Sequence, residues 1–138
     1  MRIMALDIGK VRCGIAISDP QERIASPVCV LPTNEVEHNA SSFRRVCQDW
    51  EPEMLVAGLP LTMAGEVGNQ AKENKRIAQQ IAHRLSLPLQ FVDERLSSRE
   101  AKRILREKGL SEKEMRGKVD MVAASLFLQS WLDLKNKE

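Results

Sequence analysis

The stretch LDIGKVRCGIAISD, residues 6–19, decides the fold that this sequence predicts. An apolar run ends on one carboxylate, Asp7, and after a short Gly-Lys turn a second apolar run begins at once. Two such runs joined by so short a turn predict adjacent antiparallel strands, over residues 2–8 and 11–18. A charge at the end of a buried strand is costly unless it is solvated, paired or bound to a cation. Asp7 is therefore the first candidate functional residue.

The rest of the chain alternates strands and helices around this hairpin. A third run, residues 24–31, contains Pro27, which predicts a strand at the edge of a sheet. Apolar residues spaced three and four apart predict amphipathic helices, and continuous apolar runs predict buried strands. The remaining predicted elements are a helix at 43–50, a strand at 54–61, a helix at 67–85, a strand at 87–92, a helix from 97 closed by Gly109, and a last helix at 118–134.

The order of these elements, β-β-β-α-β-α-β-α-α, predicts an α/β fold in one domain over residues 1–138. Three sequential strands with tight connections form an antiparallel meander, and the later strands return through helical crossovers. We therefore expect one mixed five-stranded sheet, with three antiparallel strands followed by parallel crossovers and with helices on both faces.

Composition and charge exclude several classes of protein. The chain has 138 residues, 43% hydrophobic and 29% charged, which suits a soluble globular domain, and no apolar run is long enough to span a bilayer. The N-terminus lacks a small-residue cleavage site, so no secretory signal is expected. Cys13, Cys29 and Cys47 form no CxxC pair and are predicted to be reduced core residues. We expect a cytoplasmic protein with no membrane contact.

Acidic residues gather at the predicted carboxyl edge of the sheet. Asp7 ends the first strand, Asp93 and Glu94 end the fifth, and Asp120 lies near the start of the last helix. In open α/β sheets the functional crevice lies outside the carboxyl ends of the strands. Carboxylates gathered there repel one another unless a hard divalent cation binds between them. Mg²⁺ or Mn²⁺ is the natural occupant, and two such ions bridged by a carboxylate hydrolyse phosphodiesters.

Each of these carboxylates also has a purely structural interpretation. Asp7 could bond its own backbone in a turn. Glu94 could pair with Arg95 or Arg99, and Asp120 in a first helical turn is stabilised by the helix dipole alone. The convergence of all of them on one edge is what favours a metal site, and it depends on the predicted topology.

Four ordered motifs carry a resemblance to a known family: ALDIGKVRCGIAISD, LVAGLPLTMAGEVGNQAKENKRIA, FVDERLSSREAKRIL and GKVDMVAASLFLQSWL. Over essentially the whole chain the sequence resembles the YqgF family, described as Holliday-junction-resolvase-like proteins and as pre-16S rRNA nucleases. The resemblance implies a ribonuclease-H-like fold and metal-dependent cleavage of nucleic acid, with 5′-end maturation of 16S ribosomal RNA as the cellular role. It also implies that Asp7, Glu94 and Asp120 are the catalytic, metal-binding carboxylates.

The fourth strand departs from the wider resolvase superfamily, which includes RuvC and where a second acidic residue is expected at the end of this strand. Here the strand reads VAGLP, with Gly58 where that carboxylate is expected. The DERLSS segment on the fifth strand resembles a displaced substitute. The sequence leaves open whether Asp93 or Glu94 is the principal second ligand.

A basic segment follows the fifth strand. Between residues 95 and 118 lie nine cations against four acids, which indicates a phosphate-binding patch, and a solvated helix face explains it about as well. The glycine-bearing loop before residue 69 and the start of the helix after it also suit a phosphate. The chain has no Tyr, so shape and phosphate contacts are favoured over base stacking. The predicted nucleic-acid-binding residues are Lys10, Arg12, Lys72, Arg95, Arg99, Lys102, Arg103 and Lys118.

Three functional hypotheses follow. The favoured one is a metal-dependent nuclease acting on structured RNA, with branched DNA, as in a Holliday-junction resolvase, as the alternative substrate. The second is a non-catalytic nucleic-acid-binding module of ribosome assembly, which the retention of all three acids argues against. The third, half of an actin-like ATPase, needs a second nucleotide-clasping domain that 138 residues do not accommodate. Ribosomal precursor particles are candidate partners, and the sequence indicates neither the cleavage position nor the oligomeric state.

Overall fold

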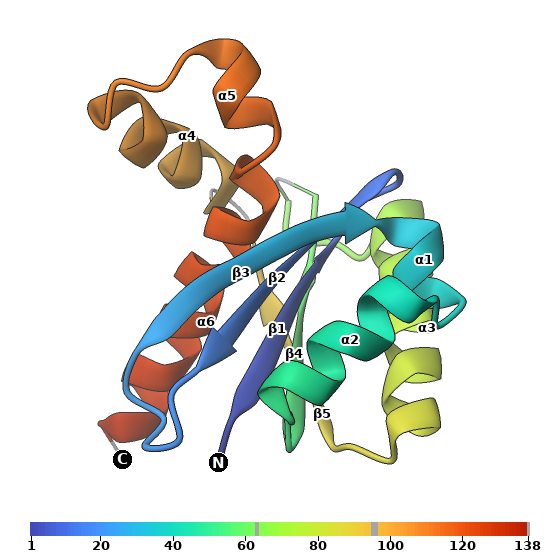
Figure 1. The fold of residues 1–138 in the computed structure, drawn as a ribbon. Helices are drawn as coiled ribbons and strands as arrows, with labels where there is room; N and C mark the ends of the chain where they lie inside the picture. The colour runs from blue at the N-terminus through green and yellow to red at the C-terminus, as the bar shows by residue number, and fades with distance from the viewer. Residues whose placement is uncertain (63, 95–96, 138) are drawn as a thin grey trace.

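A five-stranded sheet organises the protein in the computed structural model, which describes residues 1–62, 64–94 and 97–137, except for the side chain of residue 98 (Figure 1). The strand order is β3-β2-β1-β4-β5, and β2 pairs antiparallel with both β1 and β3. β1 and β5 each pair in parallel with β4, so the predicted mixed sheet is confirmed. The strands are β1 (Ile3–Ile8), β2 (Arg12–Ser18), β3 (Ala25–Pro32), β4 (Met54–Leu59) and β5 (Leu89–Asp93).

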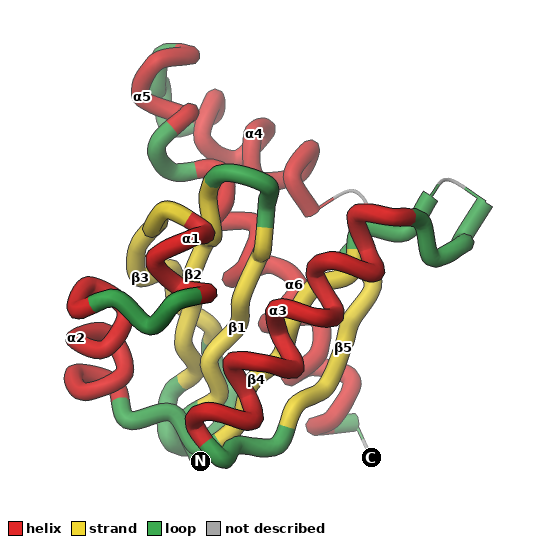
Figure 2. The backbone as a smooth tube through the Cα atoms, turned by 90° about the vertical axis from the view of Figure 1, so that its right-hand side faces the viewer, coloured by secondary structure: helices red, strands yellow, loops and turns green. Residues whose placement is uncertain are grey.

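Helices cover both faces of the sheet (Figures 1 and 2). The first three lie on one face and α6 lies on the other, while α4 and α5 extend past the carboxyl end of β1 and α4 packs against α6. The helices are α1 (Thr33–Glu37), α2 (Ser41–Trp50), α3 (Asn69–Leu85), α4 (Ser97–Glu107), α5 (Glu112–Arg116) and α6 (Val119–Asn136). None of the described helices is long and apolar enough to cross a membrane.

The alternation of side chains along the strands divides the core into two clusters. In β1 the even-numbered residues Met4 and Leu6 pack toward α2 and α3, and the odd-numbered Ile3 and Ala5 pack toward α6. Phe127 of α6 is 2% exposed, and burying a side chain of this size contributes about 1.5–3 kcal/mol. This parity decides below which acidic side chains can meet.

The edge position of β3 follows from its proline. Pro27 has no amide hydrogen to donate, and the strand lies at the edge of the sheet, as predicted. The register shifts beside it, because Ile15 pairs with Cys29 while Ala16 pairs with Pro27, which leaves Val28 as the extra residue of a bulge.

The structure contains two short helices that the sequence-based expectations did not include. Helices α1 and α5 were not predicted, because five residues carry too little periodicity to identify a helix. Helix α5 begins with a capping box in which the Ser111 hydroxyl accepts from Glu114 N and the Glu114 carboxylate accepts from Ser111 N. Gly109, with φ of 81°, follows the end of α4 as predicted.

Candidate active site at the carboxyl edge of the sheet

Asp7 lies at the carboxyl end of β1 and is only 8% exposed. It belongs to the odd-numbered side of β1, with Ile3 and Ala5, and therefore faces α6. Burial raises the pKa of Asp7, and a side-chain hydrogen bond with Glu94 opposes that rise. Asp7 thus interacts with a side chain from another strand end.

Glu94 follows directly after β5 and continues its pairing with β4. The amide of Glu94 donates to the carbonyl of Leu59 at 3.2 Å, one step beyond the pairing of Leu59 with Asp93. Val92 packs in the α6 cluster, so Glu94, two residues later, faces α6 as Asp7 does. Asp93 has the opposite parity and is exposed. The pleat of the sheet thus brings Glu94, and not Asp93, to the buried face that carries Asp7.

Gly58 provides the space that the Glu94 side chain occupies. A Cβ built on Gly58 would lie 2.5 Å from Glu94 Oε2 and 2.9 Å from Phe127 Cε2. Because real Cβ atoms do not approach other atoms so closely, any larger residue at this position would displace the carboxyl group. The space beside Gly58 of β4, where the sequence comparison leads one to expect a carboxylate, is therefore occupied by the carboxyl group of Glu94, which follows the adjacent strand β5.

The carboxyl groups of Asp7 and Glu94 interact directly with each other. Burial, a hydrogen bond with Asp7 and repulsion from the charge of Asp7 raise the pKa of Glu94 well above its usual range. Burial also raises the pKa of Asp7, and its hydrogen bond with Glu94 opposes that rise.

Asp120 lies in the first turn of α6, close to both residues. A Cβ built on Gly14, the β2 residue paired with Asp7, would lie 2.0 Å from the backbone oxygen of Asp120. The absence of a side chain at Gly14 therefore lets α6 begin directly over the sheet. The Asp120 carboxylate accepts a hydrogen bond from Arg12 Nε at 3.2 Å, and no side-chain bond caps the helix.

The β1–β2 turn, which carries Lys10 and leads into Arg12 at the start of β2, is held in place by hydrogen bonds. The amide of Gly9 donates to the carbonyl of Arg12 at 2.8 Å, and the Thr33 hydroxyl donates to the carbonyl of Gly9 at 2.8 Å. Thr33 is buried, while the side chains of Lys10 and Arg12 remain exposed. The backbone beneath the two cations is thus held at a defined position beside Asp7.

The donor chemistry of the site fits a hard divalent cation. Asp7 and Glu94 supply carboxylate oxygens, which are the ligands that such cations prefer. Burial and the charge of Asp7 raise the pKa of the nearby Cys13 thiol well above its usual range, so this thiol stays protonated. Within the described residues no group of three His, Cys, Asp or Glu side chains already surrounds one point. Two of the predicted ligands, Asp7 and Glu94, are together, and the third, Asp120, faces Arg12.

The predicted nucleic-acid-binding residues divide into distinct environments. Arg12 and Lys102 line a cavity of about 320 Å³ beside Asp120, together with Arg116, Glu112, Met115 and Val119. Arg103 instead forms ion pairs with Glu100 and Glu107 of its own helix. The other exposed members are Lys10, Lys72, Arg99 and Lys118, and Arg95 lies outside the described residues.

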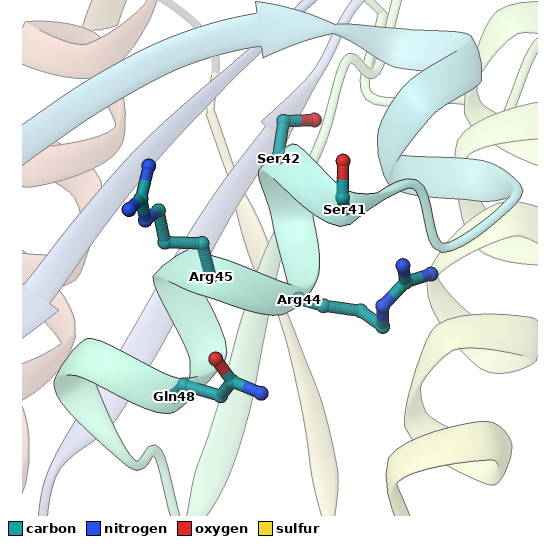
Figure 3. Close-up of a pocket in the computed structure, with 5 residues that line it drawn as sticks. All are labelled: Ser41, Ser42, Arg44, Arg45 and Gln48. Atoms are coloured by element: carbon teal, nitrogen blue, oxygen red, sulfur yellow. The ribbon is translucent and has the colours of Figure 1, made fainter.

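A larger cavity of about 410 Å³ lies on the outer side of α2, away from the acidic residues (Figure 3). It is lined by Ser41, Ser42, Arg44, Arg45 and Gln48. The two arginines point in opposite directions from the helix, and Arg44 donates to the carbonyl of Asn39. No acidic side chain lines this cavity, so we place the candidate site at the carboxyl edge of the sheet.

Sequence reasoning missed several residues on which this site depends. Gly14 and Gly58 act by leaving space, and the surrounding sequence does not show which atoms fill that space. Arg116 lines the cavity from α5, a helix that was not predicted. The Ser-x-x-Glu capping box at Ser111 was the available signal for that helix.

Comparison with known proteins adds independent findings. A family model described as "RuvX: Holliday junction resolvase" matches residues 1–134. Proteins named "Putative pre-16S rRNA nuclease" include one from Anaeromyxobacter sp. (strain Fw109-5), 40% identical over 133 residues (96% of this chain, 97% of that protein), and one from Syntrophomonas wolfei, 41% identical over 133 residues (96% and 94%). The solved structure "T. thermophilus RuvC in complex with Holliday junction substrate" matches with a TM-score of 0.60 at 12% identity, covering 99% of this chain and 96% of that one. This likeness concerns the fold, and it confirms the ribonuclease-H-like prediction.

Proposed function

The chain belongs to the RuvX (YqgF) family, and from that premise we propose that it is a divalent-metal-dependent nuclease that hydrolyses phosphodiester bonds in structured nucleic acid. The observation that carries the proposal is the contact between the buried carboxyl group of Asp7 and the partly buried carboxyl group of Glu94 at the carboxyl edge of the sheet. Two buried carboxyl groups in contact destabilise a fold unless a proton or a cation lies between them. The contact between these two carboxyl groups therefore supports a role in binding a cation.

The carboxylates Asp7 and Glu94 would hold Mg²⁺ or Mn²⁺, with Asp120 as the third ligand. The bound cation would supply Lewis-acid charge to the scissile phosphate. Both carboxyl groups would have to be deprotonated there, since a carboxylate must be deprotonated to act as a ligand. Asp93 has the wrong parity to join them and is the weaker candidate for the second ligand.

The cations around this edge would position the nucleic acid. Arg12 and Lys102 present positive charge within the cavity beside Asp120 and would contact the backbone next to the cleaved bond. Helices α4 and α5 extend past the carboxyl end of β1 (Figure 1). A duplex lying across the carboxyl edge of the sheet would therefore also contact these two helices. Such contacts read backbone shape rather than base sequence.

The substrate we favour is the 5′ region of pre-16S rRNA, within ribosomal precursor particles in the cytoplasm. The name of the relatives at about 40% identity supports this choice. Branched DNA is the second candidate, because the matching family model is described as a Holliday junction resolvase.

Matched substrates test this proposal. Purified protein is incubated with a 5′-extended 16S rRNA fragment and with a four-way DNA junction, each with Mn²⁺, with Mg²⁺ and with excess EDTA. We expect cleavage of the RNA with either cation and none in EDTA or with the Asp7→Asn variant. Undiminished cleavage in EDTA would overturn metal dependence, and faster cleavage of the junction than of the RNA would identify DNA as the substrate. Binding to the RNA without cleavage under every condition would leave only a binding module.

A further inference from the structure

Arg12 makes a single contact with a residue of the candidate site. Its Nε donates to Asp120 Oδ2 at 3.2 Å, and the two terminal nitrogens of the guanidinium have no hydrogen-bond partner among the described residues. The side chain of Arg12 is 55% exposed and that of Asp120 is 24% exposed. The contact thus uses one of the five N–H groups of the guanidinium and leaves the others available.

Breaking this contact requires little rearrangement. Exposed ion pairs contribute little to stability because water screens the charges and two side chains must be held in place. The backbone of Arg12 is fixed by its pairing with Pro32 and by the hydrogen bond from Gly9, so only the side chain has to move. Asp120, at the first turn of α6, is likewise anchored by its backbone over Gly14.

The cavity beside the ion pair offers Arg12 a second partner. It encloses about 320 Å³, and both Arg12 and Asp120 line it. Lys102 and Arg116 add two further cations to its lining against one further carboxylate, Glu112. An anion with several acceptor oxygens, such as a backbone phosphate, suits such a lining, because guanidinium binds phosphate through two parallel hydrogen bonds.

We propose that Arg12 is an exchangeable counter-ion that neutralises Asp120 until a divalent cation binds there, and that the released guanidinium then binds a substrate phosphate in this cavity. The proposal rests on the proposed function, because it assumes that Asp120 joins Asp7 and Glu94 around the cation. One consequence is cooperativity: cation and nucleic acid each strengthen the binding of the other, by the same factor. Arg12 is in this account a positioning residue that links the two ligands.

Metal affinity in the absence of nucleic acid tests the first half of the proposal. Arg12→Gln removes the cation that competes for Asp120, so the affinity for Mn²⁺, measured by calorimetric titration, should rise on the order of threefold to tenfold. Arg103→Gln, which neutralises an arginine paired within α4, is the matched control and should leave the affinity unchanged. In an Asp120→Asn background, Arg12→Gln should change the affinity by less than about twofold, because the pair no longer exists.

Binding of a fluorescent RNA hairpin in EDTA and in Ca²⁺ tests the second half. The unchanged protein should bind more tightly in Ca²⁺, and Arg12→Gln should lose most of that gain. Lys102→Gln should weaken binding under both conditions and keep the gain. If Arg12→Gln leaves Mn²⁺ affinity and the Ca²⁺ gain unaltered while Asp7→Asn loses Mn²⁺ binding, the exchange is refuted and the proposed nuclease site stands. If Asp7→Asn binds Mn²⁺ unchanged, the proposed site itself fails, and the exchange fails with it.

Discussion

Gly58 at the end of β4 and Glu94 after β5 occupy one space between two neighbouring strands. A Cβ on Gly58 would lie 2.5 Å from Glu94 Oε2 and 3.0 Å from Glu94 Cβ, so the glycine and the glutamate depend on each other. The carboxylate absent from β4 is therefore supplied from β5, at nearly the same place over the sheet.

Replacing Gly58 with Ala should damage both stability and cleavage. The added methyl group meets Phe127, which is buried and cannot move aside freely, as well as Glu94. We expect the free energy of unfolding to fall by about 1–3 kcal/mol and cleavage to fall strongly as the carboxyl group is displaced. Urea unfolding and single-turnover cleavage measure the two effects. Gly117→Ala is the control, because nothing lies within 4 Å of its Cβ and its φ of −84° suits Ala; unaltered cleavage in Gly58→Ala would contradict this account.

Gly14→Ala should be more destabilising than Gly58→Ala. The atoms that its Cβ would meet are the backbone of Asp120, at 2.0 Å, and of Met121, at 2.6 Å. The start of α6 would have to move away from the sheet, which we expect to destabilise the protein by about 3 kcal/mol or more. The measurement is again urea unfolding. A urea unfolding curve for Gly14→Ala that coincides with that of the unchanged protein would show that α6 does not rest on β2 in this way.

The pH dependence of stability should report the Asp7–Glu94 pair. The folded-state pKa of Glu94 is raised from its usual 4.5 to about 10, so the stability that this group contributes is present below pH 4.5 and is lost as the pH rises toward the folded-state pKa. Glu94→Gln removes this loss. In EDTA the variant should match the unchanged protein near about pH 4 and become progressively more stable than it from about pH 5 upward.

Added Mg²⁺ should counteract the loss of stability that the Asp7–Glu94 pair causes as the pH rises. It binds the deprotonated carboxylates, so the increase in melting temperature that it causes should grow with pH and be absent in Glu94→Gln. Parallel pH curves for the two proteins, with and without the cation, would show that Glu94 titrates normally.

The salt dependence of RNA binding should distinguish cations of the same helix. Lys102 lines the cavity next to Asp120, so Lys102→Gln should flatten the plot of log affinity against log salt by about one unit. Arg103 is held between Glu100 and Glu107, so Arg103→Gln should change the slope little. Equal slopes for all three proteins would indicate that α4 presents only a solvated face.

Much of the fold was predictable from local patterns. The five apolar runs and the proline of β3 predicted the sheet, because strand burial and the missing amide of Pro27 are properties of the residues themselves. The helices α2, α3 and α6 followed from their apolar spacing. The short helices α1 and α5 were not predicted, since their sequences carry at most one turn of pattern.

The sequence predicted which acidic residues form the candidate site, but not how their side chains are placed relative to one another. Asp7 and Glu94 were expected at one edge, but the choice between Asp93 and Glu94 depends on the parity of β5 relative to β1, which requires the register of the sheet. The pairing of Arg12 with Asp120 joins residues 108 positions apart, and no local pattern encodes it.

The central claim, that Asp7 and Glu94 together hold the divalent cation, is tested most directly by calorimetric titration of the purified protein with Mn²⁺. We predict saturable binding that weakens at least about tenfold in Asp7→Asn and in Glu94→Gln, because each loses a carboxylate ligand. Asp93→Asn, on the opposite face of β5, should bind within about twofold of the unchanged protein. Equal Mn²⁺ affinity in the unchanged protein and in Asp7→Asn would contradict the claim.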